Sequence, residues 1–327
     1  MTQSPPRLLQ YGKMPLPVLD RELAAQFDVT VLSEQADRAG FLAEHGAAFE
    51  YVVTTAAMGL PGDVVRALPN LKFVSSFGVG FDALAQASLL ERGVRVGYTP
   101  GVLDDCVADM AFALLLDAAR GLSAADRFVR RGDWSRQRFG LQTRASGKRL
   151  GIFGMGRIGG TVARRASGFD MEVAYHNRRP VEGSPHLYLP SLLALARWSD
   201  FLVITAVAGA DTRHIVNTEV LDALGPQGFL VNVARGSVVD EAALVAALQG
   251  GNIAGAGLDV FEDEPHPLPA LLALDNVVLS PHVASGTFET RRAMADLVLQ
   301  NLAQCIATGQ PVTEVPWSAE AAAARHG

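Results

Sequence analysis

The sequence predicts an α/β protein built from two doubly wound parallel sheets. In both halves of the chain, short β-branched and aromatic runs alternate with helix-sized segments, which is the pattern of parallel βαβ units. A glycine-rich G-x-G-x-x-G string directly follows the first strand of the second half. The length of 327 residues suits two hydrophobic cores better than one. We therefore expect two Rossmann-like domains.

The first hundred residues predict the first sheet. Three runs rich in β-branched and aromatic residues are bounded by Gly, Pro or Asn, as strands are, at residues 51–55, 71–77 and 94–99. The segments between them, PGDVVRAL and DALAQASLLERG, have the apolar spacing of helices. Because strands that alternate with helices pair in parallel, these residues form βαβ units.

The string TPG at residues 99–101 ends this pattern. A long helix is predicted over the run LDDCVADMAFALLLDAARGL, where Asp104 and Asp105 suit the positive end of the helix dipole. A polar, arginine-rich helix is predicted near residues 123–131, and Trp134 follows it in a loop.

From Arg149 a second and cleaner series begins. Its six candidate strands are RLGIFG, MEVAYH, DFLVIT, GFLVNVA, AGAGLDV and NVVLS. Six parallel strands with a glycine-rich first turn are the pattern of a dinucleotide-binding sheet. A final helix is predicted over residues 287–308, after the last strand and a loop.

Composition and charge indicate a folded globular protein and exclude several functions. The residues are 49% hydrophobic and 19% charged, and a net charge of −6 argues against a surface that tracks nucleic-acid phosphates. Cys106 and Cys305 lack metal-ligand spacing, so neither a disulfide framework nor a metal site is expected. No apolar stretch has the length of a signal peptide or membrane span. We expect a cytoplasmic protein that binds neither nucleic acid nor membrane.

The string GMGRIG at residues 154–159 predicts a nucleotide site. It follows the strand LGIF and opens the helix RIGGTVARRA, which is the context that the fingerprint requires. The glycines would provide a tight turn, a close approach to pyrophosphate, and tight packing of helix on strand. The alternative is a glycine-rich turn with no ligand, which this context disfavours. The predicted cofactor contacts are Gly154, Met155, Gly156, Arg157, Ile158 and Gly159.

The end of the next strand bears on the choice of nicotinamide cofactor. NAD sites usually place an acid there to bind the ribose hydroxyls, but this strand runs into Asn177, Arg178 and Arg179. Glu172 lies too early and Glu182 too late to occupy that corner. A missing acid removes repulsion of a 2′-phosphate, and two arginines can bind one. NADPH is therefore predicted over NADH, with a merely solvated turn as the alternative.

Three residues near the ends of later strands suit the chemistry of a 2-oxo acid. Arg235 follows GFLVNVA and His282 follows NVVLS, so both lie at the sheet edge where such folds bind ligands. Arginine is the two-pronged donor for a carboxylate, and histidine can give a proton to a carbonyl oxygen near neutral pH. Glu264 would orient the histidine ring and favour its imidazolium form.

The spacing alone leaves alternatives to that assignment. Glu262 and Asp263 crowd Glu264, so spacing does not say which carboxylate faces His282. From periodicity, a structural salt bridge fits as well as a catalytic pair. The other histidines that we weighed are interpreted as a polar strand end or surface residues: His176, His214 and His266.

Four strings in this order resemble those of the D-isomer-specific 2-hydroxyacid dehydrogenases: GIFGMGRIGGTVARRA, VNVARGSVVDEAALVAAL, AGLDVFEDEP and SPHVASGTFET. Four motifs in register are more specific than any one alone, and the resemblance covers most of the chain. It implies that Arg235, Glu264 and His282 form the catalytic set.

The resemblance further implies a domain boundary that the chain crosses twice. Residues 1–99 plus 286–327 would form the substrate-binding (catalytic) domain and residues 100–285 the dinucleotide-binding domain, with the active site in the cleft between them. The arm that carries Trp134 resembles the family's dimerisation element, so a homodimer is expected. The implied substrate contacts are Met58, Gly59, Val79, Gly80, Arg235 and His282.

Further cofactor contacts follow from the resemblance alone: Val207, Ala208, Thr212, Val233, Ala234, Arg235, Asp259, His282, Ser285 and Gly286. Two departures from the family pattern occur. The common C-P-L-T string after the strand at 201–204 reads AVAG, and Asp109 stands where glutamate is more usual.

Within the family, the NRRP string resembles NADPH-dependent glyoxylate/hydroxypyruvate reductases and hydroxyphenylpyruvate reductases. We expect no C-terminal regulatory domain, which argues against the longer phosphoglycerate dehydrogenases. Glu264 stands in place of glutamine, which argues against formate dehydrogenase. We expect NADPH-dependent reduction of a small 2-oxo acid to the D-2-hydroxy acid. The alternatives are a phenylpyruvate or hydroxyphenylpyruvate reductase, an NADH-linked dehydrogenase, and a non-enzymatic nucleotide sensor. Residues that could line a pocket for either acid are Met58, Leu60, Phe77 and Trp134.

Overall fold

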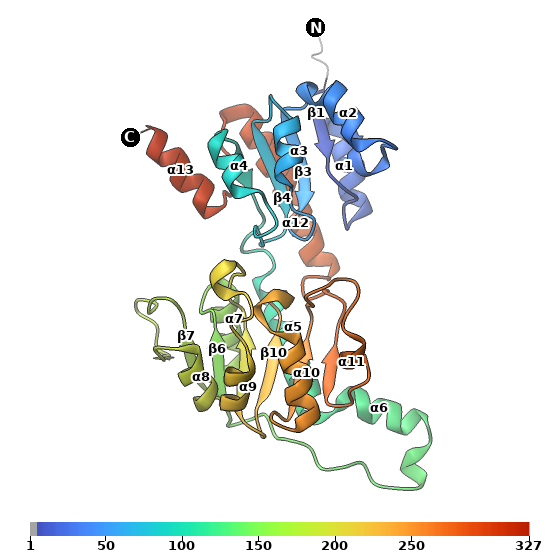
Figure 1. Ribbon diagram of the computed structural model, residues 1–327, viewed down its shortest axis with the longest axis vertical. Coiled ribbons are helices and arrows are strands. Elements are labelled where there is room, and N and C mark those ends of the chain that lie inside the picture. The colour runs from blue at the N-terminus through green and yellow to red at the C-terminus, as the bar shows by residue number, and fades with distance from the viewer. Residues whose placement is uncertain (1–4, 327) are drawn as a thin grey trace. The chain divides into compact units, whose positions relative to one another are not determined.

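The computed structural model describes residues 5–326 and divides the chain into two compact units (Figure 1). Unit 1 contains the residues up to Leu103 and those from Thr287 onward, and unit 2 contains Asp104–Gly286. Each unit is built around one parallel sheet, so the predicted α/β class with two doubly wound sheets is confirmed.

The sheet of unit 1 has five described strands, in the order β2-β1-β3-β4-β5. The three predicted strands are confirmed, the last one in shorter form: β3 (Tyr51–Thr55), β4 (Phe73–Phe77) and β5 (Arg95–Gly97). Sequence reasoning missed the other two, β1 (Arg7–Gln10) and β2 (Asp28–Val31). β2 lies at the sheet edge and has no fully buried residue, so it lacks an apolar signal.

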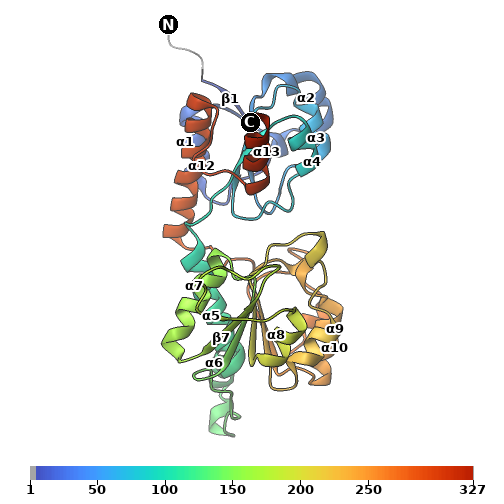
Figure 2. The same ribbon diagram turned by 90° about the vertical axis from the view of Figure 1, so that its left-hand side faces the viewer.

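Helices cover both faces of this sheet. Figure 2 shows α1 and α12 on one face, with α2, α3 and α4 on the other. The first three helices are α1 (Pro17–Gln26), α2 (Arg38–His45) and α3 (Gly62–Ala67). The others are α4 (Gln86–Glu91), α12 (Phe288–Thr308) and α13 (Pro316–His326). The ends of β3 and β4 emerge side by side from a buried core that includes Leu60, Val74 and Leu84.

The sheet of unit 2 has the order β12-β11-β10-β9-β6-β7-β8 in the described residues. The six predicted strands are present: β6 (Arg149–Phe153), β7 (Glu172–His176), β9 (Phe201–Ile204), β10 (Phe229–Asn232), β11 (Gly255–Leu258) and β12 (Val277–Leu279). The predicted count of six is wrong because a seventh, β8 (Leu187–Tyr188), pairs with β7 at the edge. Two residues are too few to show a strand pattern in sequence.

The helices of unit 2 also lie in two layers. Figure 2 shows α5 and α7 on one face of the sheet, and α8, α9 and α10 on the other. The first four are α5 (Asp104–Arg120), α6 (Leu122–Arg130), α7 (Arg157–Ala166) and α8 (Leu192–Trp198). The remaining three are α9 (Thr218–Leu224), α10 (Glu241–Gly250) and α11 (Pro269–Leu272). Strand order reverses between β6 and β9, and this switch point is where such sheets bind ligands at their carboxyl ends.

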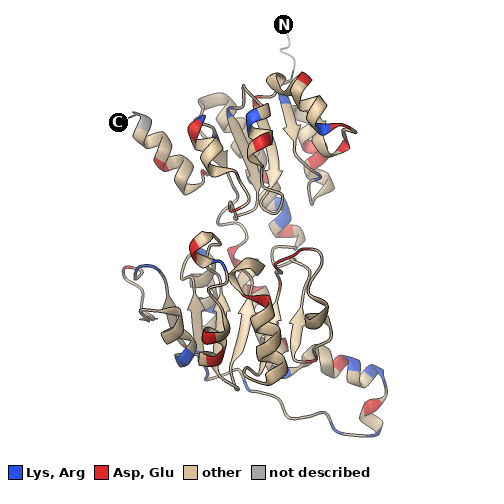
Figure 3. Cartoon of the chain, viewed as in Figure 1, with Lys and Arg blue, Asp and Glu red and all other residues tan. Residues whose placement is uncertain are grey.

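Charges are distributed over both units. Figure 3 shows acidic and basic segments interspersed along the ribbon in each unit. Among the described residues, every helix is too short or too polar to span a bilayer.

Candidate functional site

The glycine-rich turn between β6 and α7 has the geometry that its sequence predicts. Gly154 has a φ of 105°, and a Cβ there would lie 2.5 Å from the Cα of Ala206. A Cβ on Gly159 would lie 2.3 Å from the carbonyl oxygen of Gly154, so the helix packs directly on the strand end. A Cβ on Gly156 would meet no described atom within 4 Å. The turn is therefore closely packed at Gly154 and Gly159 and open at Gly156.

The open side fits the pyrophosphate of a dinucleotide. Gly156 precedes the first turn of α7, and no side chain caps that helix. A helix N-terminus offers N–H groups and the positive end of the dipole to an anion. The backbone at Gly156 is open to a ligand, because a Cβ there would meet no described atom within 4 Å. The observed backbone therefore fits a nicotinamide dinucleotide here.

At the end of β7, the side chain of Asn177 is held by the glycine-rich turn. Its Oδ1 accepts the backbone N–H of Met155 at 2.6 Å, and its Nδ2 donates to the Met155 carbonyl at 3.3 Å. The next two residues, Arg178 and Arg179, are exposed. Neither makes a recorded ion pair or side-chain hydrogen bond with the described residues. The corner thus presents two arginines and no acid.

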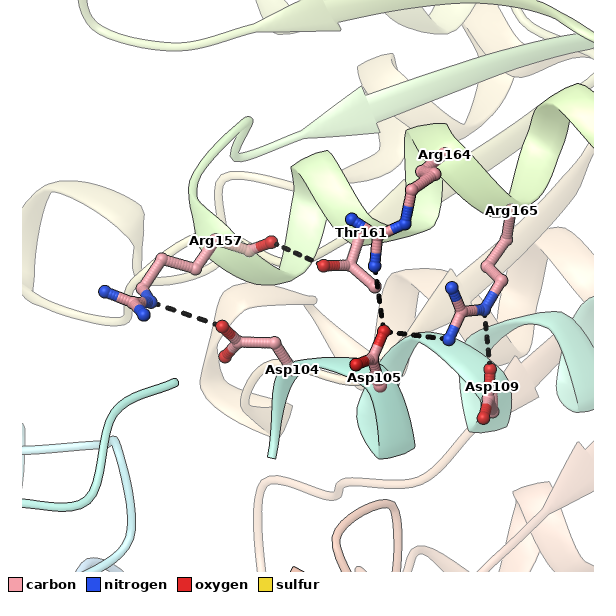
Figure 4. A network of polar contacts seen from close by, with 7 residues as sticks. All are labelled: Asp104, Asp105, Asp109, Arg157, Thr161, Arg164 and Arg165. Carbon is pink, nitrogen blue, oxygen red and sulfur yellow. Dashed lines mark hydrogen bonds and ion pairs between the residues drawn. The ribbon is translucent and has the colours of Figure 1, made fainter. Parts of the chain in front are cut away.

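The arginines of α7 behave differently (Figure 4). Arg157 pairs with Asp104 at 3.2 Å, while Arg164 and Arg165 both contact Asp105 at 2.8 Å. Arg165 also reaches Asp109 at 2.8 Å, which accounts for the acid at that position of α5. These side chains tie α7 to α5. In this geometry the side chain of Arg157 is directed to Asp104, while its backbone begins the nucleotide-binding helix.

Arg235 is placed by a turn that a buried asparagine holds. The Nδ2 of Asn232, the last residue of β10, donates to the Arg235 carbonyl at 2.9 Å, and its Oδ1 accepts the Ala234 N–H at 3.0 Å. Asn232 is 1% exposed, so its amide serves the turn and not solvent. Sequence reasoning did not single out Asn232, although a polar residue at the end of an apolar strand is the signal.

His282 faces Glu264 and neither of the neighbouring acids. Its Nδ1 lies 2.7 Å from Oε2 of Glu264, and the other carboxylate oxygen accepts the backbone N–H of Phe261 at 3.0 Å. Glu262 instead contacts Arg213 at 2.6 Å and His214 at 2.7 Å. The geometry thus pairs one of the three candidate carboxylates with the histidine.

The electrostatic surroundings keep Glu264 ionised. Partial burial works to raise its pKa, but the hydrogen bonds from His282 and Phe261 and the positive charges of His282 and Arg235 outweigh burial. The pKa of Glu264 therefore lies below its ordinary value. An ionised Glu264 can orient the imidazole and stabilise its protonated form.

Asp259 builds the loop that carries His282. It is fully buried, and its carboxylate accepts the hydroxyl of Ser280 and the N–H groups of Val283 and Ala284, the latter two at 2.9 and 2.8 Å. The Asp259 carbonyl accepts the His282 N–H at 2.8 Å. His282 has a φ of 53°, which non-glycine residues rarely adopt without such support.

The remaining cofactor candidates lie on loops near the carboxyl ends of the same strands. After β9, Thr212 accepts the Gly209 N–H at 2.9 Å and donates to the Val207 carbonyl at 3.1 Å, which closes that loop. After β10, Val233 is buried and donates to the Ile204 carbonyl. Residues for which no contact decides a role here are Ala208, Ser285 and Gly286.

The candidate substrate residues of unit 1 follow two paired strands. They lie on the loops after β3 and β4, where Ala56 donates its N–H to the Phe77 carbonyl at 3.0 Å. Gly59 has a φ of 62° and approaches the Ala83 carbonyl so closely that a Cβ would lie 2.0 Å from it. Met58 and Gly59 follow β3, and Val79 and Gly80 follow β4, the strand that pairs with it.

A pocket of about 620 Å³ in unit 2 lies elsewhere. Its lining includes Arg127 of α6, Leu141 of the following arm, and Phe229 and Val277 at the starts of β10 and β12. The amino ends of parallel strands lie opposite the edge that carries Arg235 and His282. This pocket is therefore separate from the candidate site, which consists of loops at the carboxyl ends.

The comparisons with known proteins agree with this geometry. The model of the D-isomer-specific 2-hydroxyacid dehydrogenase NAD-binding domain matches residues 112–284, which hold the glycine-rich turn and the Arg235, Glu264 and His282 positions. The chain belongs to the D-isomer-specific 2-hydroxyacid dehydrogenase family. It is an enzyme that uses a nicotinamide cofactor, and its reaction is the reduction of a 2-oxo acid.

Among its relatives, the chain is 46% identical to the hydroxyphenylpyruvate reductase of Plectranthus scutellarioides and 44% identical to a glyoxylate/hydroxypyruvate reductase of Arabidopsis thaliana. Each match covers 87% of this chain and 91% of the relative. Among solved structures, an NADPH-dependent glyoxylate/hydroxypyruvate reductase from Sinorhizobium meliloti, in complex with NADP and malonate, matches with a TM-score of 0.91 and 43% identity. That match covers 96% of this chain and 98% of the other.

Proposed function

We propose that this enzyme reduces a small 2-oxo acid of the glyoxylate or hydroxypyruvate type to the D-2-hydroxy acid with NADPH. The observation that carries the proposal is the Glu264–His282 pair at 2.7 Å, in the same unit as Arg235 and the glycine-rich turn. A carboxylate-held histidine beside an arginine combines a proton donor with an anion ligand. The Arabidopsis and Sinorhizobium relatives, both named glyoxylate/hydroxypyruvate reductases, support this substrate class.

In the proposed mechanism, Arg235 binds the substrate carboxylate and stabilises the charge that develops on the carbonyl oxygen. In unit 1, the backbone N–H groups of Val79 and Gly80 remain the proposed substrate contacts. A nicotinamide cofactor held at the glycine-rich turn would supply the hydride for the carbonyl carbon. Because Nδ1 of His282 is engaged by Glu264, Nε2 is the atom that gives the proton to the carbonyl oxygen. His282 is then neutral, and its Nδ1–H still donates to Glu264.

The preference for NADPH rests on the ribose corner. Arg178 and Arg179 are exposed, and no acid stands beside them to repel a 2′-phosphate. Asn177 would contact the ribose while its amide braces Met155. NAD would bind the same turn through its pyrophosphate but without the contribution of the two arginines.

The experiment is a panel of four 2-oxo acids, each assayed with NADPH and with NADH: glyoxylate, hydroxypyruvate, phenylpyruvate and hydroxyphenylpyruvate. We expect the highest kcat/KM with NADPH and one of the two small acids, and a product of D configuration. Higher kcat/KM with the aromatic acids would identify a hydroxyphenylpyruvate reductase instead, which the 46% identical relative makes the second candidate. Equal kcat/KM with NADH would remove the cofactor part of the proposal.

We also propose that the enzyme is a homodimer joined through α6 and the arm that follows it. α6 is polar and charged overall, yet Leu122 and Val129 are exposed on it, and the arm exposes Trp134 and Leu141. Exposed large apolar side chains on one segment favour an interface there. Sedimentation should give the mass of two chains, and Leu141→Asp should shift it towards one. A single-chain mass for the unaltered enzyme would refute the dimer.

A further inference from the structure

Glu241 is a buried acid that the proposed mechanism does not use. It is the first residue of α10 and is 5% exposed. Its Oε1 accepts the backbone N–H of Glu262 at 2.6 Å. Acids are seldom buried unless a specific contact requires them. Glu241 thus has a single well-defined partner, the peptide that joins Phe261 to Glu262.

That peptide lies at the junction of the three proposed catalytic residues. Gly236, which follows Arg235, is packed so closely on it that a Cβ would lie 1.8 Å from the carbonyl carbon of Phe261. The N–H of Phe261, which belongs to the preceding peptide, donates to Oε1 of Glu264 at 3.0 Å. A displacement of the peptide would therefore move Glu264 relative to both Arg235 and His282.

The side chain of Glu262 is held from a third direction. Arg213 and His214, in the loop after β9, lie 2.6 and 2.7 Å from its Oε1. These contacts engage Glu262 away from His282 and leave Glu264 as the partner of the imidazole. Glu262 is therefore held at two places: its side chain by the loop after β9, and its backbone N–H by Glu241.

We infer that Glu241 is a positioning residue that fixes the Glu264–His282 pair by holding the Phe261–Glu262 peptide in place. The effect of Glu241 on catalysis rests on the proposed function, whereas its effect on the geometry of the Glu264–His282 pair does not. Glu241 acts by placing an acceptor oxygen within hydrogen-bonding distance of the Glu262 N–H. Its negative charge is not needed for this role.

The charges around Glu241 agree with that distinction. Burial raises the pKa of Glu241; the N–H of Glu262 opposes this, and the carboxylates of Glu262, Asp263 and Glu264 raise the pKa further. A negative charge at this position is therefore disfavoured by its surroundings. A neutral side chain of equal length should do the same work.

Three substitutions separate the effect of side-chain length from the effect of charge. Glu241→Gln keeps an acceptor oxygen at the same distance without the charge, Glu241→Asp keeps the charge but is one methylene too short, and Glu241→Ala removes both. Asp240→Ala is the matched control, because Asp240 caps the same helix through the Ala243 N–H at 3.0 Å and does not contact the peptide. All four variants are compared by melting temperature before any assay.

We expect Glu241→Asp and Glu241→Ala to lower kcat by about tenfold to a hundredfold, as misplacement of reacting groups does, with a smaller change in KM. Their reductive activity should also be lost at a lower pH, because Glu264 then supports the imidazolium of His282 less well. Glu241→Gln should retain most of the activity and the pH profile. Asp240→Ala should lower the melting temperature without changing the pH profile.

A second measurement does not depend on the substrate. The Nδ1–H proton of His282, identified by its loss in His282→Asn, should give a downfield proton resonance in the wild type and in Glu241→Gln. It should broaden or vanish in Glu241→Asp and Glu241→Ala. If the wild type reduced no 2-oxo acid, the proposed function would fail while this resonance still decided the role of Glu241. Retention of the resonance in Glu241→Ala, or its loss in Glu241→Gln with retention in Glu241→Asp, would overturn the inference.

Discussion

Two groups of arginines follow the glycine-rich turn of unit 2, one in α7 and one after β7, and they have opposite surroundings. In α7, Arg157, Arg164 and Arg165 each reach an aspartate of α5 at 2.8 to 3.2 Å (Figure 4). After β7, Arg178 and Arg179 are exposed and have no recorded ion pair in the described residues. The two groups have the same residue type and differ in whether an aspartate of the protein pairs with them.

The difference has a simple cause in the fold. α5 and α7 pack side by side, so aspartates on one helix neutralise arginines on the other. The turn after β7 has Asn177 in place of an acid, and that asparagine is bonded to Met155. In the described residues the α7 arginines are thus paired with aspartates, whereas Arg178 and Arg179 stay exposed. Arg235 belongs to neither group: its Nη1 donates to the Ala234 carbonyl at 2.8 Å, and its positive charge lowers the pKa of Glu264.

The largest effect is expected at Arg235. Arg235→Lys keeps the positive charge but loses the two-pronged geometry, so kcat/KM for the 2-oxo acid should fall about a hundredfold. KM for the acid should rise while the dissociation constant of NADPH stays near the wild-type value. Steady-state kinetics and cofactor titration measure the two. An unchanged KM would place Arg235 with the structural arginines.

The next effect concerns the partner of His282. Glu264→Gln keeps the shape and removes the charge that favours the imidazolium, so kcat in reduction should fall at neutral pH. Activity should be lost at a lower pH than in the wild type, because reduction needs His282 protonated. The measurement is kcat/KM against pH. Identical profiles would mean that Glu264 does not act through His282.

The same substitution makes a prediction about stability. The folded pKa of Glu264 lies below its ordinary value, so its contribution to stability is present above the unfolded pKa of about 4.3 and is lost as pH falls through the folded pKa. Glu264→Gln should therefore lower the free energy of unfolding at pH 7. The difference from wild type should shrink below about pH 4. Urea unfolding at both pH values tests the sign.

A smaller and more selective effect is expected at the ribose corner. Arg178→Gln and Arg179→Gln should each raise KM for NADPH about tenfold and change KM for NADH little, because only NADPH carries the 2′-phosphate. Arg164→Gln removes the same charge from an exposed position that an aspartate already neutralises, and it serves as the matched control. Equal losses for both cofactors would show that Arg178 and Arg179 support the loop instead.

Much of unit 2 could be predicted because each feature has a local signal. The strand that ends at Phe153, the φ of Gly154 and the open space at Gly156 all follow from one string of glycines in its βα context. The short edge strand β8 and the largely unburied β2 could not be predicted, since neither shows a buried apolar pattern. Tertiary pairing, not local propensity, makes them strands.

The candidate site also has one part that the sequence predicts and one part that only the folded structure decides. Residue type and place on the sheet identified Arg235, Glu264 and His282, but spacing could not say which of three adjacent acids faces the histidine. That choice depends on Arg213 and His214, which come from a different loop and engage Glu262. The supporting roles of Asn232 and Asp259 likewise depend on backbone groups brought together only in the folded chain.

The smallest effect is expected at the paired arginines, and it sharpens the comparison most. Arg165 contacts Asp105 and Asp109 at 2.8 Å, but these aspartates keep 70% and 63% of their side-chain surface exposed. Exposed ion pairs contribute at most about 1 kcal/mol. Arg165→Gln, Asp109→Asn and the double variant should give a coupling free energy below that limit in urea unfolding, with KM for both cofactors unchanged. A rise in KM for NADPH in Arg165→Gln would show that α7 reads the cofactor through its side chains as well as its backbone.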